Sequence, residues 1–169
     1  MAVITTLGVP DNQGNTTTIM PKLAYRFRVN FIGESFSGVP TRSVISTTRP
    51  SLTHDEVTVE AYNSRIYLAG KHTWDPISIV LRDDVDSAVL RELNNQLNRQ
   101  VDHANQASSR AGSGYKFQMT VESLDGGNPT PGVLDKFELA GCYIANIQYG
   151  DMAYSNSDQV QVTVSIRYD

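Results

Sequence analysis

The feature that most constrains this chain is a strict alternation of apolar and polar side chains over residues 159–168. Five apolar residues alternate there with five polar ones: Val160, Val162, Val164, Ile166 and Tyr168 against Gln159, Gln161, Thr163, Ser165 and Arg167. Successive side chains of an extended strand point to opposite faces. The segment is therefore predicted to be a strand with one face on a core and one polar face.

The same two-residue period recurs along the chain. It predicts further strands at 23–31, 41–48, 56–62, 65–69, 73–82, 115–122 and 137–149. We expect a turn at Asn63 and Ser64, which would join the strands 56–62 and 65–69 in a hairpin. The strand 137–149 is expected to be interrupted at Gly141. Most of the chain is therefore predicted to be antiparallel β-structure.

One segment has a helical period instead. Apolar residues recur there every four positions, at Val85, Val89, Leu93, Leu97 and Val101. This spacing predicts one α-helix over about 85–104, and the carboxylates of Asp83, Asp84 and Asp86 are expected to cap free N–H groups at its start. The predicted fold class is mainly β: an antiparallel β-sandwich or barrel of about seven or eight strands with one α-helix.

The domain organisation follows from where the periodicity begins. Residues 1–21 have no period, and we predict a flexible N-terminal arm over 1–21 followed by a single β domain over 22–169. A chain of 169 residues can bury a core without a disulfide or a metal. No apolar run approaches the roughly 20 residues that span a bilayer, and the N-terminus lacks the basic start of a secretory signal. We therefore expect a cytosolic protein that does not associate with membranes.

Candidate chemical groups are few. His54, His72 and His103 lie far apart in the sequence without the spacing of a metal site on one element, so surface or interface positions are favoured. The acidic run at 83–86 lacks the glycine and the distal glutamate of a calcium loop, which favours helix capping. Cys142 has no adjacent base and is predicted to be a buried thiol. We expect no enzyme activity, no cofactor and no metal.

The charge of the chain is acidic and uneven. Lys and Arg number 14 against 18 Asp and Glu, a net charge of −4, which argues against a nucleic-acid binder with clustered cations. Residues 1–72 carry seven cations and five anions, whereas residues 111–169 carry three cations and seven anions. A basic front and an acidic back could associate head to tail. Random scatter on a monomer surface is an equal alternative at this point.

Long neutral strands such as 159–168 also raise the question of their edges. An unpaired strand edge must be covered or paired, because its free N–H and C=O groups otherwise recruit other chains. Pairing between subunits would satisfy such edges.

The order of these segments resembles that of a known family. Residues 62–84, YNSRIYLAGKHTWDPISIVLRDD, follow the strand LAYRFRVNF with its turn GESFSG, and the chain closes in QVQVTVSIRYD. This layout resembles the tail tube protein of contractile-tailed bacteriophages. The same fold family includes the tubes of contractile injection systems and the haemolysin-coregulated protein of type VI secretion. The resemblance covers about residues 22–169 and contains no catalytic signature.

The resemblance implies a structural virion protein. Such a protein forms hexameric rings that stack head to tail into the inner tube of the tail, a passive conduit for the tape-measure protein and double-stranded DNA. Its implied partners are the tail sheath, baseplate and tail-terminator proteins, and its implied location is the virion, with assembly in the host cytoplasm. Two alternatives are a tube subunit of a phage-derived contractile injection system and a monomeric β-sandwich binding module. The second would use exposed aromatics, for which Trp74, Tyr143 and Tyr149 are the candidates.

Site residues can be assigned on this basis. Because a basic lumen would hold phosphates, we expect the neutral residues Gln159, Gln161, Thr163 and Ser165 to face the channel. We expect subunit contacts at four cationic or titratable residues: Arg26, Arg28, Lys71 and His72. Ring-to-ring contacts are predicted at three segments without core periodicity: 1–21, 49–56 and 105–114.

Overall fold

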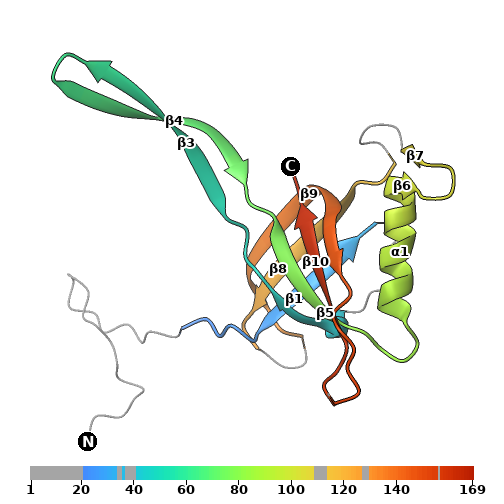
Figure 1. The fold of residues 1–169 in the computed structure, drawn as a ribbon. Coiled ribbons are helices and arrows are strands. Elements are labelled where there is room, and N and C mark those ends of the chain that lie inside the picture. Colours follow the sequence, from blue (N-terminus) through green and yellow to red (C-terminus); the bar gives the residue numbers. More distant parts are fainter. Residues whose placement is uncertain (1–20, 34–35, 37–40, 109–113, 127–129, 156) are drawn as a thin grey trace, which may run out of the picture.

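The structure is a computed structural model that describes residues 21–33, 36, 41–108, 114–126, 130–155 and 157–169. Within these residues the fold is mainly β, with a six-stranded antiparallel sheet, two separate hairpins and one α-helix (Figure 1). This confirms the predicted fold class. The strand order of the large sheet is β1-β8-β9-β10-β5-β2.

The large sheet contains six strands from both ends of the chain. They are β1 (Phe27–Ile32), β2 (Val44–Thr47), β5 (Ile77–Arg82), β8 (Phe117–Leu124), β9 (Val133–Gln148) and β10 (Gln161–Arg167). The remaining elements are a 3-10 turn η2 (Thr41–Ser43), the hairpin β3 (Leu52–Ala61) and β4 (Ser64–Trp74), the helix α1 (Ala88–Gln100), and the short hairpin β6 (Val101–Asp102) and β7 (Ala107–Ser108).

The core lies on one face of this sheet. Val162, Val164 and Ile166 of β10 are each 1% exposed, as the C-terminal alternation predicted. Strand β10 lies between β9 and β5, so its apolar face is surrounded by buried residues on both sides. The other fully buried core side chains include Val29, Ile77, Ile79, Leu81, Val89, Leu93 and Met119.

The first strand is shorter than predicted. Strand β1 begins at Phe27, because a turn in which the Arg26 N–H donates to the Leu23 carbonyl (3.1 Å) precedes it. Leu23 and Tyr25, which alternation placed on the core face, are exposed. At this end of the domain the predicted strand is wrong: the paired register of β1 with β8 begins at Phe27 opposite Ser123, and residues 23–26 form the turn in place of a strand.

The predicted hairpin around residue 63 is present and much longer. Strands β3 and β4 pair from Leu52 opposite Trp74 to Ala61 opposite Ser64, with Tyr62 at positive φ (51°) in the turn. Residues 52–55, predicted to lie in a loop at 49–56, are therefore strand, which corrects the predicted loop. The ring-to-ring contact predicted for this segment stays a prediction. The predicted strand 73–82 divides at Pro76, which separates β4 from β5.

The helix starts and ends inside its predicted limits. Ser87 adopts a left-handed conformation (φ 49°) and donates its N–H to the Asp84 carbonyl (2.8 Å), so residues 84–87 form a turn and α1 begins at Ala88. The predicted carboxylate cap is wrong: Ser87 occupies the N-cap without a side-chain hydrogen bond. Val85, predicted on the apolar stripe, is fully exposed. No helix of the described residues is long and apolar enough to cross a membrane.

Helix α1 supports a bend in the longest strand. Strand β9 pairs with β8 up to Cys142 and with β10 from Tyr143 onward, and Gly141 has a positive φ of 64° at this point. The pairing with β10 then shifts near Ile144. The Gln100 amide donates to the Ile144 carbonyl and accepts from the Ile144 N–H, both at 3.0 Å. A helix side chain thus satisfies the backbone where the ladder is irregular.

The predicted connection at 105–114 contains regular structure in its first part. Val101 and Asp102 of β6 pair with Ser108 and Ala107 of β7. Residues 109–113 lie outside the described residues, as do residues 1–20 of the predicted N-terminal arm.

Candidate assembly surfaces

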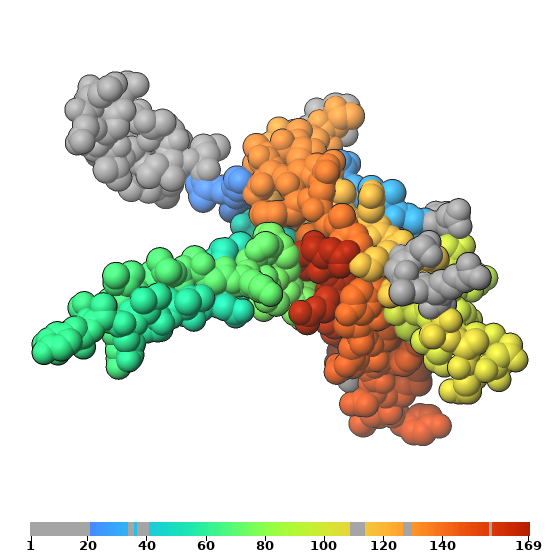
Figure 2. All heavy atoms as spheres, turned by 90° about the horizontal axis from the view of Figure 1, so that it is seen from above, coloured from blue at the N-terminus to red at the C-terminus, as the bar shows by residue number. Residues whose placement is uncertain are grey.

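The β3–β4 hairpin projects away from the sheet body, and beyond its root no other element of the described residues lies beside it (Figures 1 and 2). All residues of β3 are exposed, and so are those of β4 except Gly70 and Trp74, which are half-buried. Residues that pair across the two strands have their side chains on the same face of the hairpin, and successive residues of one strand alternate between the two faces. In β3 and β4 these two faces differ in chemistry.

One face of the hairpin is apolar. Val57 lies opposite Leu68 and Val59 lies opposite Ile66. These four side chains are 47%, 52%, 43% and 55% exposed in that order. We call Val57, Val59, Ile66 and Leu68 the apolar hairpin face. A two-stranded ribbon gains little stability by itself, and an uncovered apolar patch on it is typical of an interaction surface.

The opposite face of the hairpin is mainly polar. Glu60 lies opposite Arg65, and the two form an exposed ion pair of 3.1 Å. Thr58 lies opposite Tyr67 and donates to the Glu56 carboxylate at 3.3 Å. An exposed ion pair contributes little stability, so this face needs no partner to satisfy its groups.

The root of the hairpin is tied to the domain. The Ser51 hydroxyl donates to the Asp75 carboxylate (2.7 Å), and the Asp75 N–H donates to the Ser51 carbonyl (3.0 Å). Lys71 and His72, two of the predicted contact residues, lie exposed on β4 close to this root.

The outer surface of the large sheet has a neutral part. Thr163 lies between Gln148 and Val80, and Ser165 lies between Asn146 and Ser78. Thr163 and Ser165 are half-buried and Gln161 is exposed. All three alternate with the buried residues of β10, so their side chains lie on the face of the sheet opposite the core. We call the side chains of Gln148, Asn146, Thr163, Ser165, Val80 and Ser78 the neutral sheet face. Gln161 lies opposite Arg82 at the end of this face, and Gln159 precedes β10.

A second part of the outer surface is charged. Arg28 of β1 lies opposite Glu122 of β8 and forms a 2.7 Å ion pair with it, although the Glu122 side chain is only 8% exposed. Beside it, Lys136 and Glu138 of β9 form a 2.6 Å ion pair. Hydrogen bonding in this pair raises the pKa of Lys136 and lowers the pKa of Glu138. The charged and neutral parts belong to the two halves of β9 on either side of Gly141.

The predicted contact residues Arg26 and Arg28 have partners within the chain. Arg28 neutralises the nearly buried Glu122. Arg26 donates to the Asp125 carbonyl and lies over the Tyr25 ring, 5.5 Å from its centroid. These contacts do not test a role between subunits, which stays a prediction.

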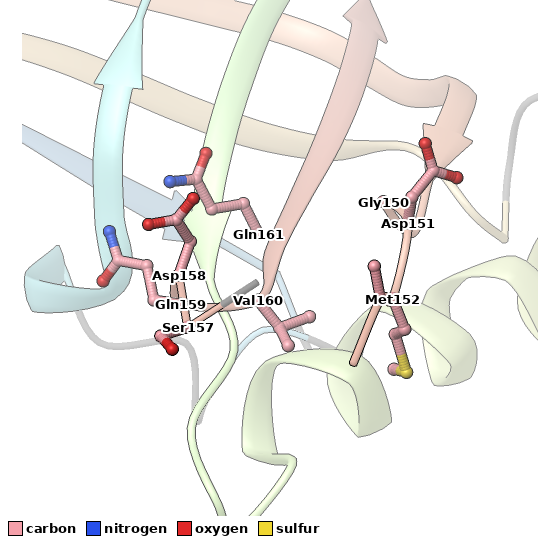
Figure 3. A pocket seen from close by; sticks show the side chains of 9 residues that line it. Gly150, Asp151, Met152, Ser157, Asp158, Gln159, Val160 and Gln161 are labelled. Carbon is pink, nitrogen blue, oxygen red and sulfur yellow. The ribbon is translucent and has the colours of Figure 1, made fainter. Parts of the chain in front are cut away.

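Two surface hollows accompany these faces. One, of about 650 Å³, lies between the segment before β1 and the edge strand β2, and its lining includes Tyr25, Phe27 and Ile45. The other, of about 710 Å³, lies in the β9–β10 connection, with Asp151 and Met152 on one side and Asp158 and Gln161 on the other (Figure 3). Neither contains a histidine or a cysteine.

Catalytic chemistry finds little support in this geometry. Cys142 is fully buried, as predicted, and burial raises the pKa of its thiol to about 11, which disfavours the reactive thiolate. No group of three or more potential metal ligands occurs among the described residues. The Trp74 ring is tilted against the Tyr168 ring, with centroids 5.9 Å apart, and Tyr143 packs edge-on to Tyr115. These two candidates for a binding platform therefore have separate aromatic partners within the chain.

Comparison with known proteins gives a match at the level of structure. No protein-family model matches the sequence, and no curated protein sequence matches it. The fold matches a chain of the anti-feeding prophage tube-terminating cap with a TM-score of 0.72 and 11% identity, covering 94% of this chain and 93% of that one. This chain therefore shares the fold of that cap chain.

Two further solved structures support this assignment of the fold. A chain of the sheath/tube terminator of an extracellular contractile injection system matches with a TM-score of 0.70 and 13% identity, over 90% of this chain and 96% of that one. A chain of the anti-feeding prophage baseplate, solved with six-fold symmetry, matches with a TM-score of 0.68 and 15% identity, over 89% and 93%. Most of the chain therefore shares one architecture with components of contractile injection machines.

Proposed function

We propose that this chain is the tube subunit of a contractile phage tail. In this proposal copies of the chain form hexameric rings that stack head to tail. The resulting tube is a passive conduit for the tape-measure protein and double-stranded DNA. The observation that carries the proposal is the uncovered apolar hairpin face on a domain whose fold matches chains of contractile-tube assemblies.

The partner of the apolar hairpin face is a second copy of the chain. A projecting ribbon with about half of each apolar side chain exposed gains stability only when another surface covers it. A hairpin that docks on a different surface of the next copy makes a heterologous contact, and such contacts generate rings or stacked filaments. Lys71 and His72 near the hairpin root would lie close to this contact. Arg26 and Arg28 would lie at the border of a second contact, made by the charged part of the sheet surface that includes Glu122, Lys136 and Glu138.

The neutral sheet face supports the conduit. Asn146, Gln148, Thr163 and Ser165 carry no charge and cannot replace counterions on DNA phosphates, so a lumen lined by them lets the duplex slide. In this proposal Gln159 and Gln161 flank the same channel at the start of β10, where Arg82 also lies. The sheath, baseplate and terminator proteins are the proposed partners outside and at the ends of the tube, and the proposed location is the virion.

A tube subunit of a contractile injection system is the second candidate. It is favoured by the matches to an extracellular contractile injection system and to the anti-feeding prophage. The two candidates share the same assembly. The neighbouring genes distinguish the two candidates. Capsid and DNA-packaging genes beside this gene would support the phage tail. Sheath and effector genes without capsid or packaging genes would support the injection system.

Negative-stain electron microscopy of the purified chain at high concentration tests the assembly. We expect six-fold rings or hollow tubes. Compact monomers at every concentration, with or without the sheath protein, would contradict the proposal and favour a monomeric binding module.

A further inference from the structure

The hairpin brings together two histidines that lie far apart in the sequence. His54 of β3 lies directly opposite His72 of β4, and their ring centroids are 6.1 Å apart with the ring planes at 59°. Both residues are exposed. The spacing along the chain did not indicate a shared site, because only the register of the hairpin makes the two imidazoles neighbours.

The geometry of this pair points to a metal chelate. We propose that His54 and His72 together bind one divalent transition-metal ion through one nitrogen of each imidazole. Nitrogen ligands lie about 2.0–2.1 Å from such an ion, which places the two ring centroids roughly 5 Å apart. The present separation is 6.1 Å, and because both rings are exposed they can rotate to close the difference.

The surroundings define which ions fit. Asp55 lies in the irregular part of β3 beside His54, and Lys71 precedes His72, so the local charge of these two neighbours cancels. The described residues supply no third ligand, so water completes the coordination. Imidazole pairs select Cu²⁺, Ni²⁺ and Zn²⁺, whereas Mg²⁺ and Ca²⁺ require oxygen ligands. The site therefore takes an imidazole-preferring ion with moderate affinity.

A bound ion would join β3 to β4 near the root of the projecting hairpin. The pairing of the two strands shifts between His54 and Glu56, and a Cβ on Gly70 would lie only 2.9 Å from the Asp55 carbonyl oxygen, so this part of the ribbon is irregular and closely packed. An ion held across the two strands would stabilise this irregular stretch. The site goes beyond the proposed function and does not rest on it, because a single copy contains both ligands.

Calorimetric titration of the full chain with Ni²⁺ tests the site. We expect one Ni²⁺ per chain, and at least tenfold weaker binding by each of the variants H54Q and H72Q. The matched control is H103Q, because His103 is also exposed but lies in the β6–β7 turn away from the pair. H103Q should bind as the unmodified chain does.

A second measurement reports on the position of the ion. Amide hydrogen exchange at residues 52–56 and 70–74 should slow when Zn²⁺ is added to the unmodified chain and to H103Q, but not when it is added to H54Q. Circular dichroism checks that each variant is folded. The proposal is overturned if the unmodified chain binds no Ni²⁺, if H54Q and H72Q bind as tightly as H103Q, or if Zn²⁺ leaves exchange at the hairpin root unchanged.

Discussion

Replacement of Val59 by lysine is the sharpest perturbation of the proposed assembly. Val59 lies on the apolar hairpin face, whereas its neighbour Thr58 lies on the polar face of the same strand. The variants V59K and T58K therefore place the same charge one residue apart on opposite faces. Both residues are exposed in the single chain, so both variants should fold.

The expected magnitude follows from the exposed fractions. Complete burial of a Val, Leu or Ile side chain contributes about 1.5–3 kcal/mol. About half of each of the four side chains of the apolar hairpin face remains exposed, so docking adds about 0.8–1.5 kcal/mol per residue and about 3–6 kcal/mol per hairpin. V59K removes about 1 kcal/mol of this and adds the cost of placing an ammonium group in the contact, for a total of about 2–3 kcal/mol.

The assay is the critical concentration for assembly, measured by pelleting and confirmed by electron microscopy. A loss of about 2–3 kcal/mol per contact raises the critical concentration roughly 30- to 150-fold. T58K should stay within about threefold of the unmodified chain, because a surface substitution changes a free energy by about 0.5 kcal/mol. Equal critical concentrations for V59K and T58K would refute the assignment of the apolar hairpin face as the docking surface.

Three further predictions concern other parts of the molecule. Q100A removes both hydrogen bonds to the Ile144 backbone and should lower the free energy of unfolding, measured by urea denaturation, by about 2–4 kcal/mol. The control N98A changes an exposed residue of the same helix and should shift this free energy by less than about 0.5 kcal/mol. Similar urea midpoints for the two variants would contradict the role of Gln100. T163K adds a cation to the neutral sheet face and, in assembled tubes, should make DNA retention in the channel salt-dependent; retention unchanged from the unmodified tube at low salt would place this face outside the lumen. Because burial raises the pKa of Cys142 to about 11, maleimide at pH 8 should label its thiol only after unfolding, and rapid labelling of the folded chain would contradict its burial.

The parts of the fold that alternation predicted well are those with a core on one side. Strand β10 was predicted with its buried and exposed positions because it pairs on both edges and one face is sealed by the core. The same alternation gives β3 an apolar face at Val57 and Val59, and in the single chain these side chains are 47% and 43% exposed. Periodicity reports that a face is apolar, but it does not say whether the cover comes from the same chain or from another.

The candidate site divides in the same way. The neutral residues of the last strand were predicted from the sequence, although their neighbours from β9 and β5 were not, because these lie many residues away and meet β10 only through sheet register. Arg28 was predicted at a subunit contact, and only the tertiary structure placed the nearly buried Glu122 opposite it. Long-range pairing has no local signal.

The sequence by itself determined the β class, the single helix, the positions of most strands and the buried thiol, because these depend on local periodicity and on hydrophobic burial. Only the tertiary structure decided that residues 52–74 leave the body as one projecting hairpin, that Gln100 holds the bend of β9, and that His54 faces His72. Each of these depends on which strands pair and in which register, and pairing is set by contacts between residues distant in the chain.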